Sequence, residues 1–153
     1  IDPTYKGVYN DMGHSYSQKG NYDEAIECYK GALKIDPNNA ETHLNMGNDY
    51  GRKGNYNMSL SSYQKAIEVN PDYAEAYYGI GITSINTEKY NKAIENFQKA
   101  VEINPEYIDA FVQMGRAYME KGEYDKSDNC IKKAAALGDK GAQRFLNEQG
   151  ISW

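Results

Sequence analysis

A repeat period of 34 residues constrains the fold of this chain more than any other feature of its sequence. Pro37, Pro71 and Pro105 are spaced by this interval. The same interval separates Gly13, Gly47, Gly81 and Gly115, and also Tyr22, Tyr56, Tyr90 and Tyr124. Self-similarity at a fixed period of this length indicates stacked supersecondary units, each of which buries its apolar face against its neighbours.

Each period has the pattern of two helices joined by a tight turn. In residues 6–39 the apolar residues of both halves recur at helical spacing. The two stripes are Val8, Tyr9, Met12 and Tyr16, then Ala25, Ile26, Tyr29, Ala32 and Leu33. Gly20 lies between them, where a left-handed helix cap favours glycine, and Pro37 ends the second helix. The period therefore predicts a helical hairpin.

The pattern of aromatic, glycine, alanine and proline residues within one period resembles the tetratricopeptide repeat. In the first period these residues are Tyr9, Gly13, Tyr16, Ala25, Tyr29, Ala32 and Pro37. Small residues let helices cross closely, and aromatic rings fill the spaces between them. The resemblance covers residues 6–141 and implies an all-α fold, a right-handed superhelical α-solenoid of antiparallel helix hairpins.

The period divides the chain into four repeats at 6–39, 40–73, 74–107 and 108–141, followed by a capping helix and tail at 142–153. Ile1-Asp2-Pro3 matches Ile35-Asp36-Pro37, so residues 1–5 are expected to be the tail of a truncated preceding repeat. In the capping segment we expect Phe145 and Leu146 to face inward and Gln143 to face water.

The third repeat departs from the pattern in its first helix and its turn. Glu88 replaces the turn glycine, and an additional glycine stands at Gly79. Since glycine in a helix interior costs about 0.5–1 kcal/mol relative to alanine, this helix is expected to be the least stable of the first helices.

Composition excludes several classes of partner. The net charge of −5 and pI near 5.1 argue against binding to nucleic acid or to an anionic membrane. No apolar run approaches the roughly 18 residues that span a bilayer, so membrane insertion is not expected. Cys28 and Cys130 occupy the same repeat position three repeats apart, which disfavours an intramolecular disulfide. Two free thiols fit a reducing compartment such as the cytoplasm.

The sequence contains no constellation of residues that would carry catalysis. His14 and His43 are the only histidines, and neither has a partner at metal-ligand spacing. Gly79-Ile80-Gly81 lacks the third glycine and the preceding strand of a phosphate-binding loop. We therefore expect a protein that is not an enzyme and that holds no cofactor and no metal.

The family resemblance implies a peptide-binding groove lined by the first helix of each repeat. Carried onto this sequence, its candidate residues are Asn10, His14, Leu44, Asn45, Asn48, Arg52, Tyr78, Ile82, Ile85, Asp109, Val112, Gln113, Arg116 and Met119. The amides suit an extended peptide backbone, and the apolar members would bind apolar anchors. Packing between adjacent first helices is the alternative role for Tyr78, Ile82 and Ile85.

The charge of the groove disfavours an acidic ligand. Relatives that hold acidic chaperone termini use a clamp of lysine, asparagine and arginine side chains, and the corresponding positions here carry Glu75 and Asp109 in place of cations. With Glu41 on the same rim, the expected ligand is a neutral or basic peptide with apolar anchors.

The expected function is a protein–protein interaction scaffold that binds a peptide segment of a partner in its concave groove. The alternative is a structural spacer or a self-associating segment of a longer repeat array, a homo-oligomer formed through the N-terminal repeat face. A regulatory arm of an enzyme whose catalytic domain lies outside this chain is a third possibility.

Overall fold

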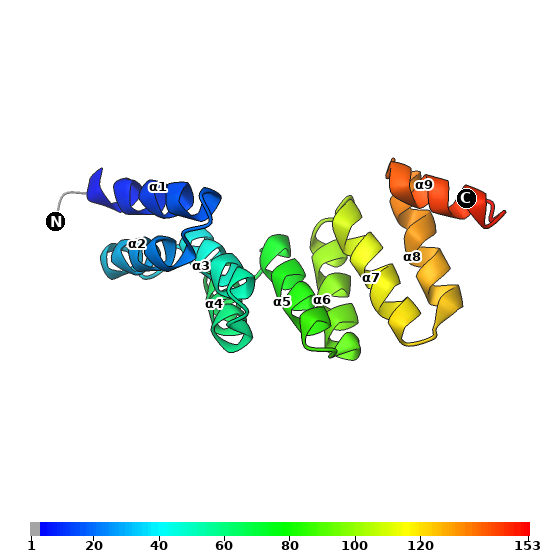
Figure 1. Cartoon of the computed structure of the whole chain (residues 1–153), viewed down its shortest axis with the longest axis horizontal. Coiled ribbons are helices and arrows are strands. Elements are labelled where there is room, and N and C mark those ends of the chain that lie inside the picture. Colours follow the sequence, from blue (N-terminus) through cyan, green and yellow to red (C-terminus); the bar gives the residue numbers. More distant parts are fainter. Residues whose placement is uncertain (1–3) are drawn as a thin grey trace. The chain divides into compact units, whose positions relative to one another are not determined.

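The computed structural model describes residues 4–153, with side chains from residue 7 onward. Over this range the chain forms nine α-helices and no strand (Figure 1), which confirms the all-α prediction. The helices are α1 (Thr4–Gln18), α2 (Tyr22–Ile35), α3 (Ala40–Arg52), α4 (Tyr56–Val69), α5 (Ala74–Asn86), α6 (Tyr90–Ile103), α7 (Ile108–Glu120), α8 (Tyr124–Ala136) and α9 (Lys140–Glu148). Of the expected repeat tail at 1–5, residues 1–3 lie outside the described range. The division of the chain at residues 39, 73 and 107 stays a prediction.

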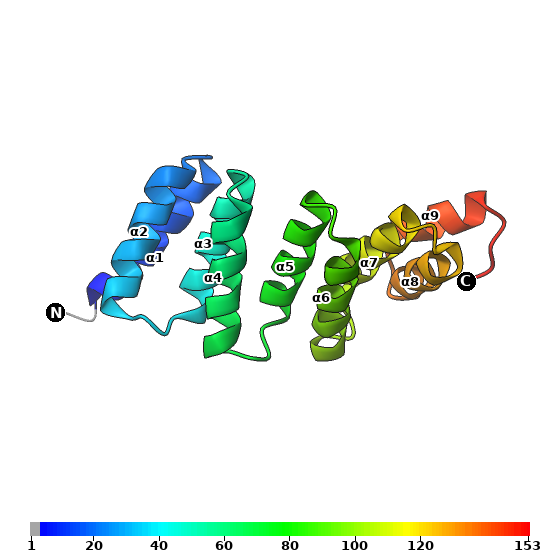
Figure 2. The same cartoon turned by 90° about the horizontal axis from the view of Figure 1, so that it is seen from below.

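The chain divides into two compact units, one ending at Gly79 and the other beginning at Ile80, so the boundary lies within α5. In the first unit α1 packs on α2, α2 on α3 and α3 on α4, and the views of Figures 1 and 2 show these neighbours together. In the second unit α6 packs on α7, α7 on α8 and α8 on α9. Each unit is therefore built chiefly from contacts between helices that follow one another in sequence, as a solenoid requires.

A close contact between a glycine of the first helix and a large side chain of the second helix recurs in every hairpin. A Cβ atom on Gly13 would lie 2.5 Å from the Tyr29 ring, and one on Gly47 would lie 2.8 Å from the Tyr63 ring. The same relation joins Gly81 to Phe97 and Gly115 to Ile131. The 34-residue glycine period therefore exists because any side chain there would overlap the facing residue.

The turns inside the hairpins use left-handed backbone. Gly20, Gly54 and Gly122 have φ values of 80°, 75° and 74°. Glu88 occupies the corresponding place in the third hairpin with a φ of 57°. A residue with a Cβ atom costs about 1–2 kcal/mol in this conformation, so the substitution noted in the sequence is a point of real backbone strain.

The C-terminal helix covers the end of the second unit. Leu146 of α9 is fully buried and packs with Ala134 and Ala135 of α8, and Phe145 is half-buried against the same cluster. The expectation that Gln143 faces water is wrong, because this side chain is half-buried and its Nε2 donates to the Ala135 carbonyl oxygen at 2.9 Å.

The C-terminal tail returns to α9. Ile151 packs against the buried cluster below that helix, and Trp153 Nε1 donates to Asn147 Oδ1 at 3.1 Å. Ala142 and Leu146 are buried, while Arg144, Asn147 and Glu148 of α9 are exposed.

We expect Gly81→Ala to lower the free energy of unfolding by about 1–3 kcal/mol, because overpacking a tight core costs this much. The added methyl group would lie 2.7 Å from Phe97 Cδ1, and the Phe97 ring is fully buried. Urea denaturation followed by circular dichroism measures the change. Gly7→Ala is the control, since a Cβ there meets nothing within 4 Å and alanine favours the helix. Equal losses in both variants would contradict the close-contact account.

Candidate functional site

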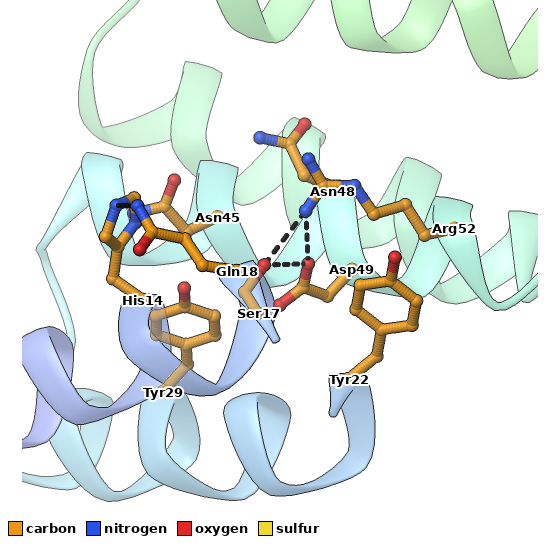
Figure 3. Close-up of a pocket in the computed structure, with 9 residues that line it drawn as sticks. All are labelled: His14, Ser17, Gln18, Tyr22, Tyr29, Asn45, Asn48, Asp49 and Arg52. Carbon is orange, nitrogen blue, oxygen red and sulfur yellow. Dashed lines mark hydrogen bonds and ion pairs between the residues drawn. The ribbon is translucent and has the colours of Figure 1, made fainter. Parts of the chain in front are cut away.

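A polar pocket of about 360 Å³ lies among α1, α2 and α3 in the first unit. We call it the α1–α3 pocket, and Figure 3 shows the side chains that line it. They are His14, Ser17, Gln18, Tyr22, Tyr29, Asn45, Asn48, Asp49 and Arg52. The hairpin α1–α2 supplies one wall and the first helix of the next hairpin supplies the other, so the pocket depends on the stacking of two consecutive hairpins.

A buried carboxylate organises one side of this pocket. Asp49 Oδ1 accepts hydrogen bonds from Ser17 Oγ at 2.7 Å and from Arg52 Nη1 at 2.9 Å, and Arg52 Nη1 also donates to Ser17 Oγ (Figure 3). The Asp49 side chain is 1% exposed, whereas that of Arg52 is 53% exposed. The guanidinium lies 5.7 Å from the centre of the Tyr22 ring. Carboxylate, hydroxyl and aromatic ring together hold Arg52 in one place.

The Asp49 carboxylate offers little to a ligand. Its Oδ1 already accepts two hydrogen bonds, and its Oδ2 is buried without a hydrogen-bond partner among the described residues. An unpaired buried acceptor costs stability, so this arrangement is an unusual feature of the unit.

Two buried tyrosines, Tyr29 and Tyr63, belong to the pocket or contact a residue that lines it. Tyr29 lines it, while the Tyr63 hydroxyl donates to Asn48 Oδ1 at 2.7 Å. Burial, reinforced by the nearby Asp49 carboxylate, raises the pKa of Tyr29 to about 12. Burial likewise raises the pKa of Tyr63 to about 12. Both phenols therefore stay protonated, as possible hydrogen-bond donors, throughout the physiological range.

A second pocket, of about 260 Å³, lies among α7, α8 and α9 in the second unit. Its lining is largely apolar, and we call it the α7–α9 pocket. The residues that line it are Val112, Arg116, Met119, Ile131, Asp139, Gly141, Ala142 and Phe145. Met119 is 41% exposed, so an apolar side chain of a ligand has access to it.

These two pockets bring together half of the groove residues expected from the sequence. The α1–α3 pocket contains His14, Asn45, Asn48 and Arg52, and the α7–α9 pocket contains Val112, Arg116 and Met119. The remaining candidates line neither pocket: Asn10, Leu44, Tyr78, Ile82, Ile85, Asp109 and Gln113.

Leu44, another of the predicted groove residues, is only 9% exposed and belongs to the core. Asn10 is half-buried, and its Oδ1 accepts a hydrogen bond from Thr42 Oγ1 at 3.1 Å, so its amide is partly used in joining α1 to α3. Tyr78, Ile82 and Ile85 are each half-buried.

The sequence reasoning missed Tyr22, Tyr29 and Asp49. Both tyrosines recur with the 34-residue period, and a periodic aromatic residue is interpreted as a packing residue and not as part of a site. For Asp49 a signal existed: the other repeats carry Ser15, Thr83 and Ala117 at this position, so a carboxylate among small residues marks a departure.

Within residues 4–153 we find no group of three or more acidic, histidine or cysteine side chains placed to hold a metal ion. The same part of the chain has no helix with the length and apolarity needed to cross a bilayer. Cys28 and Cys130 are both free thiols, and burial raises the pKa of Cys130 to about 11.

Comparison with known families identifies the repeat. A family model described as TPR repeat matches residues 13–54, 47–83 and 86–122, and a model described as tetratricopeptide repeat matches residues 108–137. The matches cover most of the chain, which therefore belongs to the tetratricopeptide repeat family. Its fold is an all-α tetratricopeptide repeat solenoid.

Two solved structures of MamA are similar to this chain. One, at 34% identity, covers 87% of this chain and 73% of that one with a TM-score of 0.78. The other, at 30% identity, covers 93% and 83% with a TM-score of 0.84. Among curated sequences, the small glutamine-rich tetratricopeptide repeat-containing protein 2 of Mycosarcoma maydis is 38% identical over 39 residues, which is 26% of this chain and 11% of that protein.

A further solved structure shares the fold alone. It is the first TPR of Spaghetti (RPAP3) bound to the HSP90 peptide SRMEEVD, at 24% identity and a TM-score of 0.75. The alignment covers 80% of this chain and 97% of that one.

We expect the free energy of unfolding to fall as the pH rises from about 10 to about 12. An unfolded tyrosine ionises near its ordinary pKa of about 10. Tyr29 and Tyr63 keep their protons to about pH 12 in the folded chain, so higher pH favours unfolding. Urea denaturation across this pH range measures the slope.

The Tyr63→Phe variant should show a smaller decline over this range, because one raised pKa is removed. Tyr124→Phe is the control, since Tyr124 is 65% exposed and should leave the slope unchanged. A slope that is the same in wild type and Tyr63→Phe would show that Tyr63 ionises alike in both states.

Proposed function

We propose that this protein binds an extended peptide segment of a partner through the first helices of its repeats. Membership of the tetratricopeptide repeat family supports the broader role of a protein-interaction scaffold. The observation that carries the narrower proposal is that side chains expected to bind peptide line a pocket in each of the two units. A non-enzymatic role belongs to the same proposal.

The two pockets differ in chemistry, and each suits a different kind of peptide group. The α1–α3 pocket presents amides and a guanidinium, which pair with polar groups. The α7–α9 pocket presents Val112, Met119 and Phe145, which suit an apolar anchor side chain. The related fold of the Spaghetti (RPAP3) domain holds a peptide, which supports a peptide as the class of ligand.

The partner peptide is proposed to be neutral or basic with apolar anchors. Glu41, Glu75 and Asp109 are all exposed, each in the first turn of its first helix. The chain carries 22 acidic and 17 basic residues, so an acidic peptide would meet net repulsion.

Selection from a displayed random peptide library against residues 1–153 tests this function. We expect Met119→Ser to weaken the selected peptides by about 1 kcal/mol or more, because an apolar contact is lost. Met58→Ser is the matched control, since Met58 is 50% exposed on α4 and lines neither pocket. Asn45→Ala and its control Asn57→Ala test the polar pocket in the same assay. Selected peptides that bind all four variants like wild type would refute the proposal.

Self-association through α1 is a second candidate, and the exposure of α1 favours it. Val8, Tyr9 and Met12 are 51%, 38% and 43% exposed. The positions that correspond to Val8 in later repeats, Thr42 and Ala110, are fully buried. The α1 surface thus has the composition of an interface between repeats, which a second copy would cover.

Light-scattering mass over a concentration series tests this candidate. We expect the mass to rise with concentration in the wild type and to stay that of a monomer in Met12→Glu, because a charge at the centre of the patch opposes its burial. Met58→Glu, at an exposed methionine on α4, is the control. A constant monomer mass for the wild type would remove self-association through α1.

A further inference from the structure

Asn48 is held so that only one end of its amide faces the α1–α3 pocket. Its Oδ1 accepts a hydrogen bond from the Tyr63 hydroxyl at 2.7 Å, and its Nδ2 has no partner among the described residues. Asn48 is half-buried and lines the pocket, whereas Tyr63 is 4% exposed and does not line it. An unrestrained amide could present either its oxygen or its nitrogen. Here the oxygen is engaged, so the nitrogen is the end presented to a ligand.

The position of the Tyr63 ring is fixed by two glycines. A Cβ atom on Gly47 would lie 2.8 Å from the ring, and one on Gly79 would lie 2.5 Å from Cζ, the carbon that bears the hydroxyl. The corresponding positions of the other repeats carry Asp11, Asn45 and Gln113 in place of Gly79. Gly79, which the sequence presents as a weakness of α5, thus makes room for the hydroxyl end of Tyr63.

The other polar groups of the pocket also favour a ligand that accepts hydrogen bonds. Arg52 uses Nη1 to bind Asp49 and Ser17, which leaves the N–H groups on Nε and Nη2 available. Asp49 is closed to a ligand, since Oδ1 accepts two bonds and Oδ2 is buried. In Figure 3 the Tyr29 hydroxyl points to the same side of the pocket as Gln18 and Asn45. The guanidinium that is open to a ligand therefore favours a ligand that accepts hydrogen bonds.

We propose that the α1–α3 pocket binds an acceptor oxygen of the partner, a carbonyl or a carboxylate, and that Tyr63 is the positioning residue that sets this preference through Asn48. The inference rests on the proposed peptide-binding function and specifies what its polar pocket recognises. Without the Tyr63 hydroxyl the Asn48 amide is free to turn, and Asn48 no longer discriminates an acceptor from a donor.

Nuclear magnetic resonance of the ¹⁵N-labelled full chain tests this proposal with three small probes at equal ionic strength. N-acetylglycine carries a carboxylate, N,N-dimethylacetamide carries a carbonyl and no N–H donor, and ethylammonium carries donors only. We expect the two acceptor probes to shift the Asn48 Nδ2 and Arg52 Nε resonances and ethylammonium to leave them unchanged. A larger response to N-acetylglycine identifies a carboxylate as the natural group, and equal responses identify a carbonyl.

The Tyr63→Phe variant isolates the positioning role. We expect its Asn48 response to acceptor probes to fall about fivefold and a response to ethylammonium to appear. The fold should persist, since Phe97 occupies the corresponding place in the third repeat. Tyr56→Phe, which removes a hydroxyl from the same helix, is the control. Asn48→Asp is a second variant, at a half-buried position. We expect the Arg52 Nε resonance of this variant to lose its response to N-acetylglycine.

Three results would overturn the proposal: a wild-type response to ethylammonium alone, no response to any probe, or unchanged selectivity in Tyr63→Phe. These outcomes are distinct from failure of peptide binding. A pocket that selects acceptor probes in a chain that retains no library peptide would refute the proposed function and leave the pocket's chemistry standing.

Discussion

The contact between a first-helix glycine and a large second-helix side chain is the interaction on which the rest of the structure depends. Gly13 faces Tyr29, Gly47 faces Tyr63, Gly81 faces Phe97 and Gly115 faces Ile131. Each glycine removes the side chain that would keep the two helices apart, so the facing side chain packs directly on the backbone. This contact closes each hairpin and fixes which face of the first helix is turned away from it.

The same contact connects the fold to the candidate site. Tyr29 and Tyr63 are packing residues by position, yet each carries a hydroxyl at the end of its ring. Tyr29 lines the α1–α3 pocket, and Tyr63 donates a hydrogen bond to Asn48, which lines the same pocket. In the hairpins where Phe97 and Ile131 take this position, no hydroxyl is available for such a role. Whether a hydroxyl is available at the pocket thus depends on which side chain faces the first-helix glycine in that repeat.

The helices and seven of the residues that line the two pockets could be predicted because they follow the 34-residue period. Periodic residues such as Gly47 and Pro37 report local geometry, which each repeat determines alone. Ser17 and Asp49 lie 32 residues apart and meet across two hairpins, a contact that no single repeat encodes. Leu44 is buried although the corresponding Asn10, Tyr78 and Val112 are half-buried, so its place in the period does not predict its burial. In the α7–α9 pocket, Val112, Arg116 and Met119 follow the period and were predicted. Phe145 comes from α9, which lies outside the period, and was not predicted to line a site.

Two departures from the period, at Asp49 and Gly79, each cost stability near the α1–α3 pocket. A buried carboxylate where other repeats have small residues costs desolvation energy, and the Ser17 and Arg52 hydrogen bonds offset it at only one oxygen. Gly79 weakens α5 as a helix while it admits the Tyr63 ring. Both departures act on the same pocket, Asp49 by holding Arg52 and Gly79 by placing Tyr63 against Asn48. The two departures from the period thus coincide at one pocket, where local consistency of the sequence with the fold is broken twice.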